Sequence, residues 1–404
     1  MRGFLRRTPV EQAVAWIDQL AAPGIRETIP LAAACGRVLA GEVIAERNVP
    51  EFDRAAMDGI ALRAADSTGA GDYNPLEFTL TGESLPGRPF AGSIGPHQAA
   101  RIMTGAPIPT GADAVVPAEF VQFDGDRATI TAASPQFKHV GRIGEDIRAG
   151  SQVLPDGRCL RPQDVGVIAS LGIAEVAVIR RPRVRIVVTG NELAPPGRPK
   201  TDSQIYEANS AMLRGLIARD GGELDGCVHL RDERDLIRDT LAADQADIIL
   251  VSGGSSVGAE DHAPGLVAEL GELAIHGIAM RPSSPTGLGR IGATAVCLLP
   301  GNPVSCLCAY DFFAGRLLRR WGGRSPEWPY RRRRGALSQK IASAIGRVDY
   351  CRVCIDDEEI RPLALSGASI LSSTTRADGF VIVPAGLEGY AAGTEVEALL
   401  YDGV

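Results

Sequence analysis

Two short apolar runs, each followed by a loop of small residues, constrain this 404-residue chain more than any other feature. One is DIILVSGGSSVGAED at residues 247–261, and the other is AVCLLPGNPVS at residues 295–305. Each run is typical of a buried parallel strand. Because ligands of open α/β sheets bind beyond the carboxyl ends of the strands, we expect both loops to border one site. For each loop alone, an ordinary strand–turn–helix joint without a ligand remains the alternative.

The residues in these loops suit an anion. Gly253 and Gly254 permit positive φ angles and a close approach of the backbone, so that N–H groups could cradle a phosphate. Asp261 ends the first loop and could hold a hard cation beside that phosphate. In the second loop, Asn302 stands at an N-cap position and Pro303 at the first helical position, which predicts a helix with its N-terminus at the site.

Composition narrows the class of protein. Hydrophobic residues make up 45% and charged residues 23%, as in soluble globular proteins. A net charge of −7 argues against general nucleic-acid binding, and we interpret the basic run at 331–334 as a solvated linker. No run of 18 apolar residues and no signal-peptide core occur, which predicts a cytoplasmic protein without a membrane span. Eight scattered cysteines fit a reducing compartment, and we expect no zinc or redox site at Cys351 and Cys354.

The order of patterns along the chain predicts a multidomain α/β plus β protein. Strands and helices alternate over 183–323, which indicates an α/β domain with a parallel sheet. Short runs broken by Gly and Pro indicate an inserted β module, and those near the C-terminus indicate a small β-barrel or a sandwich. Helices are also expected at 31–42, at 162–171, and after a capping box formed by Thr8 and Glu11. The expected domains are a discontinuous helical domain (1–48 and 140–180), the inserted β domain (49–139), the α/β domain (181–324) and the barrel (325–404).

Several longer motifs occur in a fixed order over nearly the whole chain. They are FDRAAMDG (52–59), RIMTGAPIPTGADAVV (101–116), GEDIR (144–148), VVTGNEL (187–193) and QIYEAN (204–209), followed by the two loops above. With these motifs the chain resembles the molybdopterin molybdenumtransferases, called MoeA in bacteria and the E domain in gephyrin. The resemblance implies an L-shaped, four-part subunit with a MogA-like α/β domain that binds molybdopterin. It also implies a homodimer with the active cleft between two subunits.

The resemblance further implies a reaction. Molybdate is inserted into adenylylated molybdopterin in the presence of Mg²⁺, and AMP and molybdenum cofactor are released. Transient contacts with the adenylyltransferase and with acceptor molybdoenzymes are implied as well. No nucleic acid and no membrane take part.

Motif by motif, the resemblance implies a set of site residues. The expected catalytic carboxylates are Asp58, Asp146, Glu192, Asp232 and Asp261. Glu192 and Asp261 are also the expected ligands of Mg²⁺, because this ion prefers oxygen ligands. The expected substrate-binding residues are Thr189, Gly190, Ser252, Gly253, Gly254, Arg281, Pro300, Gly301, Asn302, Ser305 and Arg352. A helix N-cap is the alternative role for Asp232, a turn for Asp58, and a solvated surface position for either arginine.

The chain departs from the family pattern at charged positions. Asn191 stands where the family usually has aspartate, and Gly277 and Ser284 stand where it usually has lysine. Lys200 is the one lysine of the α/β domain. These departures favour an alternative, a divergent paralogue that binds and delivers molybdopterin or molybdenum cofactor without efficient transfer. A third hypothesis is a gephyrin-like scaffold, for which the sequence contains no motif. The sequence does not decide whether the metal substrate is molybdate or tungstate.

Overall fold

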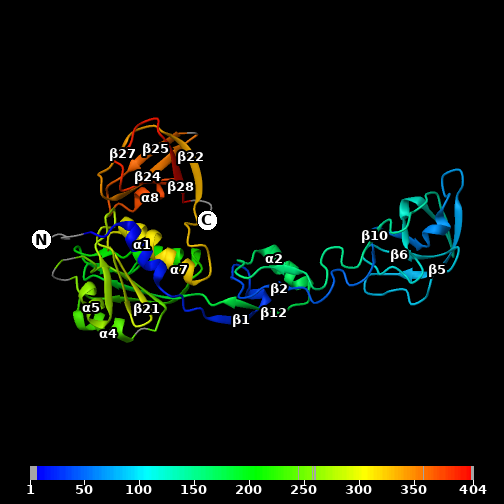
Figure 1. The fold of residues 1–404 in the computed structure, drawn as a ribbon, viewed down its shortest axis with the longest axis horizontal. Coiled ribbons are helices and arrows are strands. Elements are labelled where there is room, and N and C mark those ends of the chain that lie inside the picture. The colour runs from blue at the N-terminus through cyan, green and yellow to red at the C-terminus, as the bar shows by residue number, and fades with distance from the viewer. Residues whose placement is uncertain (1–6, 244, 257, 259–260, 358, 402–404) are drawn as a thin grey trace. The chain divides into compact units, whose positions relative to one another are not determined.

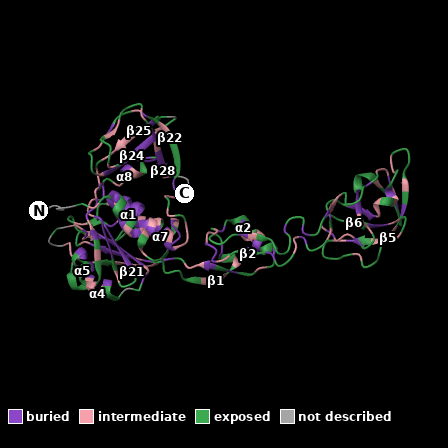
Figure 2. Ribbon diagram, viewed as in Figure 1, coloured by how far each residue is buried: buried purple, intermediate pink, exposed green. Residues whose placement is uncertain are grey.

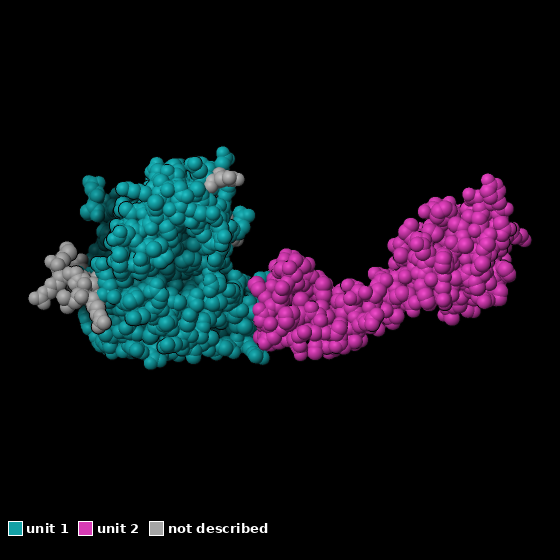
Figure 3. Space-filling view, turned by 45° about the horizontal axis from the view of Figure 1, so that its top comes forward, with its two compact units in different colours: residues 1–27, 36–38, 178–404 teal, residues 28–35, 39–177 magenta. Residues whose placement is uncertain are grey.

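The computed structural model describes residues 7–243, 245–256, 258, 261–357 and 359–401. Its chain forms two compact units, one of Met1–Glu27, Gly36–Val38 and Val178–Val404, the other of Thr28–Cys35 and Leu39–Ala177 (Figure 3). Two of the boundaries between the units fall within β1 (Arg26–Pro30) and β12 (Glu175–Ile179). The four-part division given above, with its bounds, remains our proposal.

The first unit contains a six-stranded sheet, of which β21 is labelled in Figure 1. Its strand order is β16 (Glu223–Leu230), β13 (Arg183–Thr189), β17 (Ile248–Ser252), β21 (Thr294–Leu299), β20 (Gly287–Ile291) and β18 (Glu272–His276). The first four strands are parallel, whereas β20 and β18 are antiparallel to their neighbours. The prediction of a parallel sheet was therefore wrong for β20, whereas β18, antiparallel to β20, runs in the same direction as β21. A two-residue turn with Gly292 at φ +60° joins β20 to β21, and so short a link permits only antiparallel pairing.

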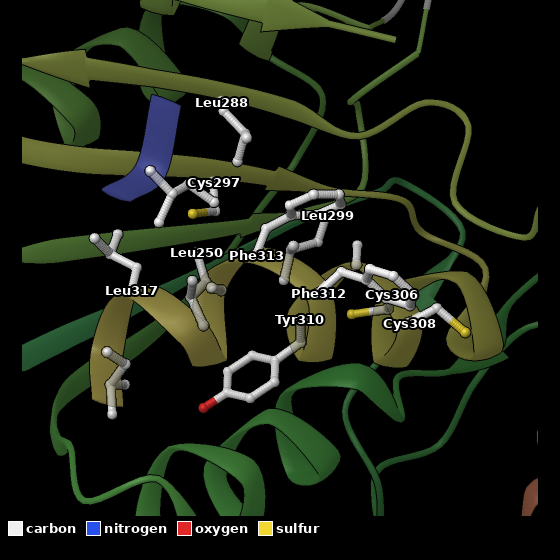
Figure 4. Packing of buried hydrophobic residues seen from close by; sticks show 14 of the residues in the cluster. Leu250, Leu288, Cys297, Leu299, Cys306, Cys308, Tyr310, Phe312, Phe313 and Leu317 are labelled. Atoms are coloured by element: carbon white, nitrogen blue, oxygen red, sulfur yellow. The ribbon is translucent and has the colours of Figure 1, made fainter. Parts of the chain in front are cut away.

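Helices cover both faces of this sheet. Because side chains alternate along a strand, Ile186 and Val188 of β13 face one buried cluster and Val187 faces another. The first cluster includes residues of α1 (Val10–Gln19), α3 (Asn209–Arg219), α6 (Pro303–Ala309), the π-helical turn η4 (Tyr310–Ala314) and α7 (Gly315–Trp321). The second cluster includes residues of α4 (Arg234–Ala243) and α5 (Ala263–Leu270). Figure 4 shows part of the first cluster, and Figure 2 colours each residue of the chain by how far it is buried.

A closed five-stranded β-barrel follows in the same unit, as predicted. It consists of β22 (Arg331–Leu337), β24 (Val348–Asp356), β25 (Glu359–Ala364), β26 (Gly379–Val383) and β28 (Glu395–Leu400). Pairing of β24 with β26 closes the ring. Smaller elements are β19 (Met280–Arg281) beside β24, the pair β23 (Ile341–Ala342) and β27 (Gly389–Tyr390), and α8 (Ser372–Thr375). The basic run 331–334 is the exposed start of β22 and not a linker.

The second unit contains the predicted β module. Its six-stranded sheet has the order β7 (Ala114–Pro117), β4 (Gly59–Leu62), β6 (Gln98–Ile102), β5 (Leu76–Ser84), β9 (Arg127–Ile130) and β8 (Val121–Asp124). Shorter elements are β2 (Val43–Ile44) with β11 (Gln152–Leu154), β3 (Arg54–Ala55) with β10 (Val140–Gly141), and the one-turn helices η2 (Ala64–Ser67) and η3 (Ala118–Phe120). The predicted helix at 162–171 is α2 (Pro162–Ser170).

Two local predictions were wrong. Residues 31–42 form only the one-turn helix η1 (Leu31–Ala33), because Gly36 and Gly41 take φ angles of +75° and +146°, which end helical geometry. The capping box before α1 does not form: Pro9 is the N-cap residue and makes no side-chain bond, while Thr8 bridges to Ile278 instead. Among the described residues, no helix is long and apolar enough to cross a membrane.

Candidate functional site

A pocket of about 580 Å³ lies at the carboxyl ends of three parallel strands of the first unit. Thr189 ends β13, Ser252 ends β17, and residues 300–302 follow β21. The two loops that dominate the sequence thus border the same pocket, where the open-sheet rule expects a ligand. Its described lining is Thr189, Gly190, Glu192, Leu193, Ile205, Tyr206, Glu207, Ala208, Asn209, Asp232, Ser252, Gly253, Gly254, Ser255, Ser256, Asp261, Pro285, Pro300, Gly301, Asn302, Pro303 and Ser369.

Glycine is required where the first loop meets β13. A Cβ atom on Gly253, whose φ angle is +99°, would lie 2.2 Å from the carbonyl oxygen of Thr189. Gly254, with a φ angle of +55°, would place a Cβ atom 2.9 Å from the Thr189 hydroxyl oxygen. The backbone of this loop therefore lies against β13 in a conformation that other residues rarely adopt.

Asn209 connects the two loops. Its side-chain nitrogen donates to the hydroxyl oxygen of Ser252 at 2.9 Å and to the carbonyl oxygen of Gly301 at 2.8 Å. Since a carbonyl can only accept, the amide nitrogen must face Gly301. Asn209 is the first residue of α3 and is buried, so this helix fixes the spacing of the loops. Asn209 ends the QIYEAN motif, but the sequence alone did not single out this residue.

The charged side chains among the described lining residues are all acidic. Glu192, Glu207, Asp232 and Asp261 all line the pocket, and its described lining residues include no lysine, arginine or histidine. Asp261 accepts a bond from the N–H of Gly258 at 2.6 Å. The buried Glu207 accepts bonds from the backbone N–H and the hydroxyl of Ser210, at 2.8 and 2.5 Å, and so forms part of the wall.

The capping role considered for Asp232 is wrong. Its carboxylate accepts a bond from the N–H of Asn191 at 3.0 Å, and its own N–H donates to the side-chain oxygen of Asn191 at 3.4 Å. Helix α4 begins two residues later, at Arg234. The reciprocal pair ties the loop after β13 to the segment after β16, at the rim of the pocket.

Three predicted substrate-binding residues do not line this pocket. Arg352 is fully buried on β24 and donates to the carbonyl oxygen of Ser366, while its Nε and one terminal nitrogen have no partner among the described atoms. Arg281 donates to the buried Asp349 at 2.7 Å. Ser305 is buried within α6, and its carbonyl oxygen accepts a bond from Ser283. The buried carboxylate of Asp349 holds Arg281 away from the pocket lining.

Two predicted catalytic residues belong to the second unit. Asp58 accepts bonds from the backbone N–H of Thr104 at 2.7 Å and from its hydroxyl at 2.8 Å. These bonds, the backbone one first, hold the pKa of Asp58 below its usual value. The alternative of a turn aspartate bonded to its own loop is wrong, since Thr104 belongs to a different motif. Asp146 is exposed and lines a groove of this unit together with Arg158 and Arg161.

Near Asp146, a buried carboxylate stabilises the start of α2. Asp164 accepts bonds from the guanidinium groups of Arg161 and Arg158 and, at 2.9 Å, from the backbone N–H of Arg161. The bond from the Arg161 side chain, together with those from Arg158 and the backbone, outweighs the effect of burial and holds the pKa of Asp164 well below its usual range. Asp164 therefore stays ionised and contributes to stability at neutral pH.

Cys351 and Cys354 lie on one strand and do not face each other. Cys351 and Cys354 are three residues apart on β24, so their side chains leave opposite faces of the strand. Burial raises the pKa of Cys351 to about 12. Among the described residues, no group of three or more His, Cys, Asp or Glu side chains converges in a way that could hold a metal ion.

Comparison with known proteins agrees with this arrangement. Three family models match the chain in order: the MoeA N-terminal region (domain I and II) at residues 8–172, a "Probable molybdopterin binding domain" at 185–320, and the MoeA C-terminal region (domain IV) at 334–401. The chain belongs to the molybdopterin molybdenumtransferase family. Among its relatives, molybdopterin molybdenumtransferase 2 of Mycobacterium tuberculosis is 37% identical over 92% of this chain and 94% of its own length.

Further relatives extend the match to solved structures. The molybdopterin molybdenumtransferase of Haemophilus influenzae is 32% identical over 94% of this chain and 95% of its own length. The crystal structure of a molybdopterin biosynthesis MoeA protein from Pyrococcus horikoshii is 31% identical and covers 99% of this chain and 100% of its own, with a TM-score of 0.85. The family match therefore covers both units, including the pocket.

Proposed function

We propose that this chain inserts molybdate into adenylylated molybdopterin and releases AMP and molybdenum cofactor. The observation that supports this most is the pocket, in which the glycine loops after β13, β17 and β21 border one space in a chain of the molybdenumtransferase family. In this proposal, backbone N–H groups of Gly254, Gly301 and Asn302 hold the phosphate groups. Gly190, Ser252, Gly253 and Pro300 shape the loops around the ligand, and Thr189 supplies a hydroxyl.

The charge of the pocket supports a requirement for Mg²⁺. Four carboxylates with no cationic side chain among the described lining residues would repel a phosphoanhydride. At a separation of about 4 Å, each carboxylate–phosphate pair would cost about 4 kcal/mol at an effective dielectric constant of 20. A divalent cation removes this repulsion, and Mg²⁺ is commonly bound by one or two carboxylates plus substrate phosphates. We assign Glu192 and Asp261 as these ligands and Asp232 as a nearby acidic group.

The molybdate contacts in this proposal lie outside the pocket lining. Arg352 has buried nitrogens without a partner among the described atoms, and a buried guanidinium group gains most from an anionic partner. We assign Arg352, together with Arg281 and Ser305, to the binding of molybdate. We further propose a homodimer in which Asp58 and Asp146 act on the cleft of the partner subunit, and transient contacts with the adenylyltransferase and acceptor molybdoenzymes.

The test is AMP release by the purified chain from adenylylated molybdopterin, with Mg²⁺ and with or without molybdate. The proposal expects AMP release that molybdate stimulates and that a chelator abolishes. Glu192→Gln and Asp261→Asn should raise the Mg²⁺ concentration needed for half-maximal rate, whereas Glu272→Gln, at an exposed ion pair on β18, should not. Release that neither molybdate nor Mg²⁺ affects would refute the transferase proposal.

The carrier alternative also has an observation in its favour, since the described residues of the pocket lining include no lysine and the chain has Gly277 and Ser284 where the family usually has lysine. Under that hypothesis the chain retains the adenylylated pterin, and molybdate does not stimulate AMP release. The same experiment therefore separates the two functions.

A further inference from the structure

Tyr206 is exposed at the rim of a polar pocket. It is the one aromatic side chain among the described lining residues, and it leaves 50% of its surface exposed; its neighbour Ile205 leaves 59% exposed. Other large aromatic side chains of this unit, such as Tyr310, Tyr350 and Phe380, are fully buried. An exposed ring beside loops suited to phosphate indicates contact with something flat and apolar.

The backbone holds this ring in place. Tyr206 lies on β15 (Ile205–Tyr206), which pairs in parallel with β14 (Leu193–Ala194). The N–H of Ile205 donates to the carbonyl oxygen of Glu192 at 2.8 Å, and the N–H of Glu207 donates to that of Ala194 at 2.9 Å. Tyr206 is therefore fixed close to Glu192, the carboxylate assigned to Mg²⁺, and needs little ordering when a ligand binds.

A cation accompanies the ring. The ammonium nitrogen of Lys200 lies 5.9 Å from the centroid of Tyr206. Lys200 is the one lysine of the α/β domain, and it brings a positive charge beside Tyr206, whereas the described residues of the pocket lining are acidic or neutral. A ring and a cation beside a phosphate site together match a ligand in which a heteroaromatic ring is joined to phosphate.

We propose that Tyr206 is a specificity-determining residue whose exposed face stacks on a fused nitrogen heteroaromatic ring of the ligand. This inference rests on the proposed function, whose substrate carries such a ring at each end, the pterin and the adenine. Stacking of a base on an aromatic side chain is sensitive to alanine substitution by about 5- to 150-fold in affinity. The hydroxyl of Tyr206 is not needed for stacking, so phenylalanine should serve as well.

The test uses the full chain with Mg²⁺ and three probes: AMP, 6-carboxypterin, and ribose 5-phosphate as a probe without a ring. Binding is measured by calorimetry for the wild type, Tyr206→Ala, Tyr206→Phe and the control Tyr73→Ala. Tyr73 is fully exposed and does not line the pocket. We expect Tyr206→Ala to weaken AMP, 6-carboxypterin or both by about 5- to 150-fold, and Tyr206→Phe to change affinity by less than about 3-fold. Ribose 5-phosphate should bind equally to all four proteins.

The outcomes separate this inference from the proposed function. If only AMP loses affinity, the ring is adenine; if only 6-carboxypterin does, it is the pterin. Unchanged binding of both ring probes by Tyr206→Ala would overturn the inference, and so would an equal loss for ribose 5-phosphate or no binding of either ring by the wild type. A selective loss of ring binding in a chain that shows no molybdate-stimulated AMP release would uphold Tyr206 while refuting the transferase.

Discussion

Replacing Gly253 by alanine should damage the pocket through a single methyl group. The new Cβ atom would lie 2.2 Å from the Thr189 carbonyl oxygen, whereas real Cβ atoms essentially never approach within 3.0 Å. The loop and the end of β13 would therefore have to separate by about 0.8 Å. A side chain at the φ angle of +99° adds a conformational cost of about 1–3 kcal/mol.

These costs predict two measurable effects. The free energy of unfolding of the first unit should fall by about 1–3 kcal/mol, which corresponds to a decrease in Tm of about 2–12 °C. Displacing catalytic groups by nearly 1 Å can lower rates about 100-fold, so kcat/KM for AMP release should fall by about that factor. Thermal unfolding and steady-state kinetics on the same preparation measure both.

Gly301→Ala is the matched control in the facing loop. Its Cβ atom would have the Cα atom of Gly253 as nearest neighbour at 3.6 Å, an ordinary contact, and its φ angle is not in the positive region. We expect this variant to keep the Tm within about 2 °C of the wild type. A Gly253→Ala protein with wild-type Tm and kinetics, or a Gly301→Ala protein that is equally damaged, would show that the close contact with β13 is not what the pocket requires.

Three further predictions follow from single contacts. Asp164→Asn should lower the free energy of unfolding of the second unit by about 1–3 kcal/mol at pH 7. Because the pKa of Asp164 is depressed in the folded state, this contribution is present above the unfolded-state pKa of about 3.9 and declines as the pH falls below it. Urea titrations of wild type and variant should therefore converge in acid. Asn209→Asp places a carboxylate oxygen opposite the Gly301 carbonyl and should weaken AMP binding at least about 10-fold by calorimetry, so unchanged affinity would argue against its role in spacing the loops. Combining Asn191→Asp with Ser284→Lys should raise molybdate-stimulated AMP release if the chain is a carrier, whereas a transferase whose rate is already stimulated by molybdate should gain less than about 3-fold.

The fold could be predicted where local pattern and tertiary packing agree. Strands β17 and β21 are buried on both faces, so their apolar runs were recognisable, and the glycines that follow them marked the pocket. The prediction failed at 31–42, where apolar spacing suggested a helix but glycines with positive φ angles ended it after one turn. It also failed for β20, which runs opposite to the other strands because a two-residue turn joins it to β21.

The pocket lining also contains residues that could be predicted from the sequence and residues that could not. Residues at strand ends could be predicted from sequence, because parallel strands bring their carboxyl ends to one edge of a sheet. Asn209 and Tyr206 could not be predicted in this way. Asn209 acts through bonds to two loops that are distant in the sequence, and Tyr206 through its exposure at the rim of the pocket. The QIYEAN motif was the available signal, but a motif does not reveal which of its side chains reaches the pocket.

By itself, the sequence determined the alternation of strands and helices, the glycine loops and the acidic residues, because these depend on local backbone preference and on the spacing of apolar residues. The tertiary structure decided which charges meet. It placed Asn191 opposite Asp232, placed Arg281 against the buried Asp349, and left the described pocket lining without a cation. Such pairings join residues far apart in the chain, and only packing of the folded chain brings them within hydrogen-bonding distance.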